Sequence, residues 1–266
     1  MAADAGTMLR QWRSQRSISQ LDLAYDVGVS PRHLSFVETG KSRPSPALLE
    51  ALSARLDIPL RERNALLLAA GHAPRYTEES LDAAAMQRIR TSVQRILDAH
   101  NPNPGLALDR SWNVVLANDT ATTLAGLLPE HLQGPPFNLF RASLHPEGFA
   151  RVTENLDIWA SYLMDTLRRL VRVTGDPRLA AIEREVREYP TVAHLDRAWG
   201  RQTERAASEP ALLVPFVLRL GDEVLSFFTT LTTFGTPRDI TLEEMTIEMF
   251  YPADETTEKA VARMQG

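Results

Sequence analysis

The stretch SISQLDLAYDVGVSPRHLSFVETGKSRPS, residues 17–45, contains the start and stop signals of two short helices. Ser19 suits a helix N-terminus, because its hydroxyl can accept a hydrogen bond from a free backbone N–H, and Asp22 follows in a position like that of a capping box. Apolar residues then recur at helical spacing, at Leu21, Ala24 and Val27. Ala24 is small enough to let another helix cross closely, so the pattern predicts a short helix packed against a neighbour.

The second helix of this stretch follows a tight turn. Gly28 supplies the positive φ that such a turn needs. Ser30 is a second N-cap, and Pro31 stands at the first helical position, where a backbone N–H is not required. The inner stripe of the helix is formed by Leu34 and Val37. Gly40 then ends it in the left-handed conformation, so the two helices are expected to form a helix-turn-helix.

The same residues resemble a known class of DNA-binding domain. The matching pieces are Ser19-Gln20, Gly28-Val29-Ser30, Glu38-Thr39-Gly40 and Pro44-Ser45. Together they resemble the phage-repressor class (Cro/cI, or XRE) over about residues 6–71. The resemblance implies that the second helix enters the major groove and that its first residues contact base edges.

Carried onto this chain, the resemblance implies a set of DNA-binding residues: Gln20, Ser30, Pro31, Arg32, His33, Phe36, Lys41 and Arg43. Arg32 is the candidate for a bidentate contact to guanine, worth about 1–3 kcal/mol of base discrimination. Lys41 and Arg43 lie in the following loop and are expected to meet phosphate. Pro31 and Phe36 depart from the family pattern, which favours polar base-contacting residues at these positions, and Phe36 can instead touch a thymine methyl group. The alternative is a small helical bundle whose arginines are simply solvated.

Flanking segments predict the rest of a five-helix, lambda-repressor-like domain over residues 1–73. Helices are expected at residues 6–16, from Ser45-Pro46 to Pro59, and at residues 61–70. Gly71 ends the last of these, and His72-Ala73-Pro74 marks a domain boundary.

Residues 74–100 are expected to be a linker with a long amphipathic helix over residues 79–100. Its apolar residues are spaced 3, 4 and 3 apart, at Met86, Ile89, Val93 and Ile96. Such a seam can pair two subunits or pack on the second domain, and one and a half heptads do not distinguish the two. A homodimer suits the motif, since phage-repressor-class domains usually read paired half-sites.

Charge is distributed unevenly over the 266 residues, whose net charge is −5. Residues 1–75 hold ten basic and seven acidic residues, a balance of +3, and the remainder has a balance of −8. A basic N-terminal domain beside an acidic body is consistent with one face that meets phosphate. Cysteine is absent, so disulfides and thiol chemistry are excluded. With no long apolar run and no secretion signal, we expect a cytoplasmic protein without a membrane span.

After the turn cluster at Asn101–Pro104 the pattern changes to a second domain over residues 101–266. Strands are expected at residues 105–109, 113–118, 212–220, 223–234 and 240–250, and helices through Leu124 and at residues 151–173, 177–188, 195–199 and 254–264. Two strands, a block of helices and three more strands predict an α+β domain with an antiparallel sheet and helices on one face. The order resembles a PAS-like fold.

Particular residues in this domain resemble the ligand-binding domain of MmyB-like transcription regulators. The matching pieces are Trp112–Asn118, Asn138–Phe140, Leu144–Gly148, Thr174–Pro177, Phe234–Pro237 with Asp239, and Glu248–Asp254. They span about residues 104–260. The resemblance implies a bacterial repressor or activator whose second domain holds a small apolar molecule, plausibly a fatty acid or acyl compound.

Apolar residues that could line such a pocket are abundant: Trp159, Tyr162, Leu163, Leu167, Phe216, Phe227 and Phe234. Three cationic candidates could hold a carboxylate: Arg141, His145 and Arg151. For each residue there is a plainer alternative. The aromatic residues can be ordinary core, His145 can be a turn residue before a proline, and the arginines can be solvated.

The resulting expectation is a sequence-specific, DNA-binding transcriptional regulator that binds double-stranded DNA, forms a homodimer and senses a small apolar effector. No catalytic residue, metal or other cofactor is expected, because phosphate-binding and dinucleotide motifs and a His-Glu-x-x-His pattern are absent and the six histidines lack metal-ligand spacing. The alternative is a DNA-binding regulator whose second domain docks a protein or dimerises and holds no small molecule. A sealed apolar cavity would favour sensing, and an exposed apolar patch would favour docking.

Overall fold

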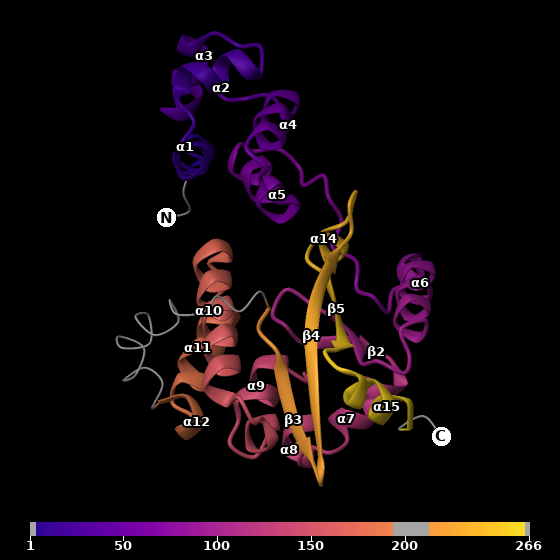
Figure 1. The fold of residues 1–266 in the computed structure, drawn as a ribbon. Coiled ribbons are helices and arrows are strands. Elements are labelled where there is room, and N and C mark those ends of the chain that lie inside the picture. The colour runs from indigo at the N-terminus through magenta and orange to yellow at the C-terminus, as the bar shows by residue number, and fades with distance from the viewer. Residues whose placement is uncertain (1–3, 194–212, 264–266) are drawn as a thin grey trace. The chain divides into compact units, whose positions relative to one another are not determined.

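The computed structural model describes residues 4–193 and 213–263, which form two compact units (Figure 1). The first unit consists of residues 1–83 together with Phe234–Glu244, and the second of Ala84–Thr233 together with Met245–Gly266. The sequence placed the first domain at residues 1–73, so the compact unit is longer and also takes in a segment from late in the chain. Within the described residues, no helix is long and apolar enough to cross a membrane.

Five helices build the core of the first unit, as the sequence predicted. They are α1 (Ala5–Gln15), α2 (Gln20–Asp26), α3 (Pro31–Glu38), α4 (Pro46–Arg55) and α5 (Leu60–Ala69). Serine side chains cap three of them, since Ser19, Ser30 and Ser45 accept hydrogen bonds from the backbone N–H of Asp22, His33 and Leu48. Gly28 and Gly40 adopt φ of 72° and 70°, which confirms the two predicted left-handed positions.

The buried stripe of α2 differs from the prediction at one position. Leu23 and Ala24 are fully buried, whereas Leu21 is 64% exposed. Leu23, Ala24 and Val27 share one face at helical spacing, and Leu21 lies about 200° around the helix from Leu23. The expected role of Leu21 in the stripe was therefore wrong.

A buried carboxylate holds three helices of the first unit together. Glu38, at the end of α3, is 2% exposed. Its Oε1 accepts from Arg13 Nε of α1 at 2.7 Å, and its Oε2 accepts from Arg13 Nη2 and from Gln20 Nε2 of α2, each at 2.9 Å. A buried charge is tolerated only when paired in this way, so the pair fixes how α1, α2 and α3 pack.

The second unit is built on one antiparallel sheet. Its strands are β1 (Gly105–Leu108), β2 (Val114–Ala117), β3 (Phe216–Leu220), β4 (Glu223–Thr233) and β5 (Thr246–Pro252), in the order β2-β1-β5-β4-β3. The α+β class is thus confirmed. The predicted strand at residues 240–250 was wrong in its first half, where Asp239 caps the short helix α14 (Ile240–Glu243). The Asp239 carboxylate accepts from the N–H groups of Thr241 and Leu242, which starts a helix there.

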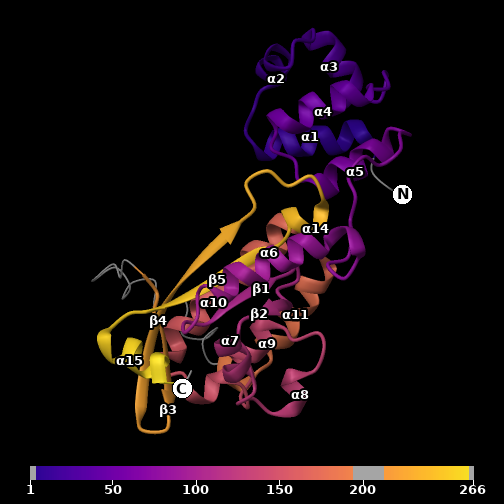
Figure 2. The same cartoon turned by 90° about the vertical axis from the view of Figure 1, so that its right-hand side faces the viewer.

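Helices cover both faces of this sheet (Figures 1 and 2). On the face that carries Leu106 and Phe250 lie α9 (Leu139–Leu144), α10 (Leu156–Thr174) and α11 (Pro177–Arg187). On the opposite face α6 (Gln87–Asp98) packs on β1 and β2, where Gly105 and Ala107 leave room for it. The expectation of helices on one face was therefore incomplete.

Shorter elements complete the second unit: η1 (Ala84–Met86), α7 (Asp119–Ala125), α8 (Glu130–Gln133), η2 (Phe149–Val152), α12 (Pro190–Ala193) and α15 (Glu255–Arg263). The helix predicted at residues 195–199 lies outside the described residues.

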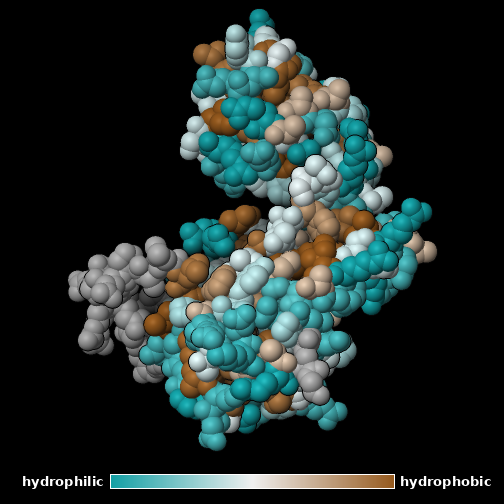
Figure 3. Space-filling model, turned by 45° about the vertical axis from the view of Figure 1, so that its right-hand side comes forward, coloured by the Kyte–Doolittle hydropathy of each residue, from teal (hydrophilic) through white to brown (hydrophobic). Residues whose placement is uncertain are grey.

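In the space-filling view, hydrophilic side chains cover much of the visible face of each unit, and hydrophobic residues are exposed as separate patches (Figure 3).

The helix expected over residues 79–100 begins at Gln87 in the structure. Residues 77–79 do not join the helix, because Thr77 pairs with Asp239 in a parallel bridge and the N–H of Glu79 donates to the Asp239 carboxylate at 3.1 Å. Met86 and Val93 of the predicted seam are buried within the chain, whereas Ile96 is 42% exposed. The packing of α6 on β1 and β2 agrees with the alternative in which this helix packs on the second domain. Pairing of two subunits through the same helix stays a prediction.

The Arg13–Glu38 pair generates a prediction about stability. In Arg13→Met, the buried Glu38 carboxylate loses its main partner, and we expect the free energy of unfolding to fall by about 2–5 kcal/mol. In the matched variant Arg55→Met, the lost partner is Asp26, whose 2.6 Å ion pair with Arg55 is largely exposed, and the expected loss is below about 1 kcal/mol. Urea unfolding of the full chain, followed by helical circular dichroism, measures both. Equal losses in the two variants would contradict the role given to Glu38.

Candidate DNA-binding surface and ligand cavity

The exposed face of α3 presents two cations around one aromatic ring. Arg32 is exposed, and its guanidinium carbon lies 5.4 Å from the centre of the half-buried Phe36 ring. Lys41 Nζ lies 5.9 Å from the same ring. Contacts of this kind hold a cation in place without neutralising it. Phe36 thus positions two positive charges that remain available for an anionic partner.

Other predicted DNA-binding residues have structural partners within the first unit. The Gln20 amide donates to Glu38, and the Ser30 hydroxyl caps α3. Arg43 Nε donates to the carbonyl of Ala70 at 2.6 Å, and Arg43 Nη2 donates to that of Gly71, at the C-terminal end of α5. These bonds fix the side chains locally, and their contacts with DNA stay predictions.

Pro31 and His33 complete the predicted set at the start of α3. Both residues are neighbours of Arg32 on the first turn of the helix. Pro31 is exposed and His33 is half-buried. The N-terminus of a helix that also carries exposed cations attracts phosphate and can reach base edges. Pro31 and Arg32 are therefore accessible at the start of α3, and base contacts by any of these residues stay a prediction.

An apolar cavity of about 50 Å³ lies in the second unit, between the sheet and its helices. Its lining residues come from the strands, from α7, α9 and α10, and from the connecting loops: Pro104, Leu106, Ala121, Leu124, Ala125, Phe137, Leu139, Ser143, Phe149, Trp159, Phe216, Leu218, Phe227 and Phe250. Ser143 is the one member of this set with a polar side chain other than the indole N–H of Trp159. A wall of this composition suits an apolar occupant.

Aromatic rings form one side of the cavity. Trp159 stacks on Phe216 with ring centres 4.7 Å apart, and Phe216 and Phe227 lie 6.1 and 6.4 Å from Phe250. The four rings form a continuous aromatic wall. Three of these rings, those of Trp159, Phe216 and Phe227, were predicted from the sequence.

The remaining predicted apolar residues lie elsewhere. Tyr162 lies beside Trp159, with ring centres 5.3 Å apart, and Leu163 belongs to the surrounding core. Leu167 is also buried in that core. Phe234 belongs to the first compact unit.

The three predicted cations do not line this cavity. Arg141 forms a bidentate pair with Glu185, with Nη2 and Oε2 2.6 Å apart, and this pair lowers the pKa of the Glu185 carboxyl. Arg151 lines a separate hollow with Arg219 and Gly221. His145 packs edge-on against Tyr189, with ring centres 5.0 Å apart. A role for any of the three in holding a carboxylate stays a prediction.

Sequence reasoning missed a buried acid near the cavity. Glu248 on β5 is 2% exposed, and burial raises the pKa of its carboxyl to about 7, although a hydrogen bond with Thr229 opposes the shift. The strand alternation carried no clear signal. Thr246, Glu248 and Phe250 share one face and Ile247 and Met249 the other, so the pattern alone does not place Glu248 on the inner face.

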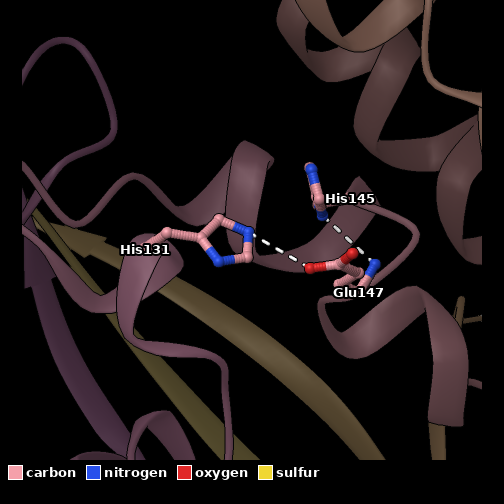
Figure 4. Close-up of side chains that lie close together, drawn as sticks. All are labelled: His131, His145 and Glu147. Carbon is pink, nitrogen blue, oxygen red and sulfur yellow. Dashed lines mark hydrogen bonds and ion pairs between the residues drawn. The ribbon is translucent and has the colours of Figure 1, made fainter.

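A second missed group is a cluster of His131, His145 and Glu147 (Figure 4). His131 Nε2 lies 3.4 Å from Glu147 Oε2, and His145 Nδ1 accepts from the Glu147 backbone N–H at 3.1 Å. One potential ligand atom from each residue lies within 4.8 Å of the others. The spacing along the chain gave no sign of this cluster, because folding brings α8 next to the loop after α9.

The segment between β4 and β5 makes a set of polar contacts within the first unit. The N–H of Leu60, which begins α5 without a side-chain cap, donates to Glu243 Oε2 at 2.7 Å. Arg61 Nε donates to Glu244 Oε1 at 2.7 Å, and Thr77 Oγ1 donates to Asp239 Oδ2 at the same distance. We call these three contacts the α5 clamp. Two of them tie the segment that follows the cavity-lining strand β4 to helix α5 of the first unit, and the third ties it to Thr77.

Comparison with known proteins agrees with both halves of this description. Residues 9–63 match a family described as helix-turn-helix, and residues 89–264 match the MmyB-like transcription regulator ligand binding domain. The uncharacterized HTH-type transcriptional regulator RghRB of Bacillus subtilis (strain 168) is 35% identical over 80 residues. Those residues are 30% of this chain and 55% of that protein, so the chain spans little more than half the length of this relative.

The second of these families matches well over half of the chain, on the unit that holds the apolar cavity, and the first matches the helices that carry Arg32 and Phe36. The chain therefore belongs to the family of proteins that carry the MmyB-like transcription regulator ligand binding domain, and its N-terminal helices match a helix-turn-helix family.

Proposed function

We propose that this protein is a one-component regulator whose second unit senses a small apolar effector, a fatty acid or an acyl-like compound. The observation that carries the proposal is the cavity lined almost wholly by apolar side chains, inside the domain that matches a ligand-binding family. The protein acts without catalysis, in the cytoplasm, where its DNA lies. The cavity volume of about 50 Å³ is too small for an acyl chain. The effector therefore binds a form of the protein in which the cavity wall has opened.

The effector controls DNA binding through the strands that line its cavity. Phe227 lies on β4 and Phe250 on β5, and the segment that joins these strands carries the α5 clamp. A change in the tilt of these rings alters the strand ends and therefore the position of Glu243 and Glu244. An effector shifts the equilibrium only if it binds the two arrangements with unequal affinity.

On DNA, the exposed face of α3 lies in the major groove, with Arg32 at the base edges and Lys41 near phosphate. A homodimer places two such helices on paired half-sites. Phosphate attraction makes the affinity fall steeply with salt.

A first prediction concerns base recognition. Because Arg32 is held by Phe36 and makes no ion pair among the described residues, Arg32→Ala removes a base contact directly, and we expect binding to weaken by about 1–3 kcal/mol with relaxed preference at one base pair. DNA selected from random duplexes by the full chain, followed by fluorescence anisotropy, measures both effects. Arg75→Ala, at an exposed arginine outside α3, is the matched control. Unchanged affinity and base preference in Arg32→Ala would show that α3 is not the recognition helix.

A second prediction concerns control by the effector. With decanoate and 1-decanol added separately at saturation, we expect at least one of them to change DNA affinity by about threefold or more. Arg61→Met removes the ion pairs with Glu244 and Glu78. This variant should still bind the probe and DNA, but the probe should change its DNA affinity by less than half as much.

The control is Arg263→Met, which loses an exposed partner, Glu223, and leaves the α5 clamp intact. A full response in Arg61→Met would exclude the clamp as the route of control. If neither compound binds the chain and a partner protein is captured instead, the second unit is a docking module.

A further inference from the structure

Two buried polar atoms on the cavity side of the sheet have no hydrogen-bond partner among the described residues. They are Glu248 Oε2 and Trp159 Nε1. Glu248 is 2% exposed and Trp159 is 3% exposed, so bulk water does not replace the missing partners. Buried polar groups are nearly always hydrogen-bonded in folded proteins, and an exception calls for a partner that is absent from the chain itself.

Both atoms belong to residues at the cavity. Trp159 lines it directly. Glu248 pairs with Leu106 across β1 and β5, and residues directly opposite in an antiparallel pair project to the same face of the sheet. Leu106 lines the cavity, as does Phe250, which is two residues farther along the same face of β5. The Glu248 carboxyl therefore lies beside the cavity wall.

The surroundings of Glu248 offer it no opposite charge. No ion pair with Glu248 occurs within the described residues, and its one hydrogen-bond partner is the neutral Thr229. Burial together with the Glu248 charge raises the pKa of the nearby Tyr162 hydroxyl, so Tyr162 also stays neutral. The charge of Arg169 acts on the Tyr162 hydroxyl, and in the described part of the chain no cation is among the groups that shift the pKa of Glu248.

We propose that Glu248 and Trp159 form the polar end of the cavity and select an acyl-like molecule whose own polar end is an uncharged hydroxyl, rather than a fatty-acid anion. A hydroxyl can donate its proton to Glu248 Oε2 and accept a hydrogen bond from the Trp159 N–H. One hydroxyl group can therefore satisfy both the unpartnered acceptor and the unpartnered donor. This inference rests on the proposed function, because it names the class of effector for the same cavity.

A fatty-acid anion fits this end poorly. Its carboxylate would bring a second negative charge next to Glu248 in a low-dielectric site, where like charges cannot both remain ionised at small cost. It also lacks a proton to donate to Glu248 Oε2. The aliphatic chain, in contrast, contacts the same apolar wall in either compound, so the difference in affinity reports on the polar end alone.

The test compares two probes that differ only in that end, 1-decanol and decanoate. The full-length chain is freed of bound lipid, and both affinities are measured by isothermal titration calorimetry at about pH 8, where decanoate is ionised. We expect 1-decanol to bind at least about tenfold more tightly. In Glu248→Gln, which keeps the shape of the side chain and removes its charge, we expect the preference to fall to within about threefold. Glu255→Gln, at an exposed acid on α15 outside the cavity, should keep the full preference.

Each outcome separates this inference from the proposed function. A preference for 1-decanol that is lost in Glu248→Gln alone supports the inference. Equal or tighter binding of decanoate by the unmodified chain overturns it while leaving the effector cavity in place. Failure of both probes to bind overturns the inference and the proposed effector class together. If the Glu248→Gln variant does not fold, the affinities of the unmodified chain for 1-decanol and decanoate still decide which polar end the cavity prefers.

Discussion

Strand β5 is the constraint on which the second unit depends. It pairs with β1 on one side and with β4 on the other, so it joins strands that lie more than a hundred residues apart in the sequence. Those ladders satisfy the backbone of β5 on both edges, and its inner face then carries Glu248 and Phe250. The position of β5 places Phe250 in the cavity wall and leaves the Glu248 carboxyl unpartnered beside it. The segment that makes the α5 clamp leads directly into this strand.

In the first unit, local signals were enough to predict the fold. Ser19, Ser30 and Ser45 cap their helices because each hydroxyl needs only a backbone N–H three residues away, and Gly28 and Gly40 need only a positive φ. The error at Leu21 arose because two overlapping apolar stripes fit the same short helix, and packing on α3 and α4 decides between them.

In the second unit the sequence predicted most elements and three of the cavity residues, but long-range contacts set the rest. Residues 240–243 look strand-like, and they become helix because Asp239 is held by Thr77 and caps the turn. Similarly, nothing local pairs Arg141 with Glu185, which lie 44 residues apart. Glu248 was missed because its significance depends on which face of β5 is buried, and that depends on strands from both ends of the domain.

The first unit presents two cations around Phe36, and the second unit contains an apolar cavity with an unpartnered acid beside its wall. Sensing of an apolar effector requires the second unit to hold a small apolar molecule. The mass of the freshly purified chain, measured under native and then denaturing conditions, tests this requirement. We expect a native species heavier by a few hundred daltons, with the extra mass lost on denaturation. A native mass equal to a bare multiple of the chain, both as purified and after incubation with 1-decanol, would contradict it.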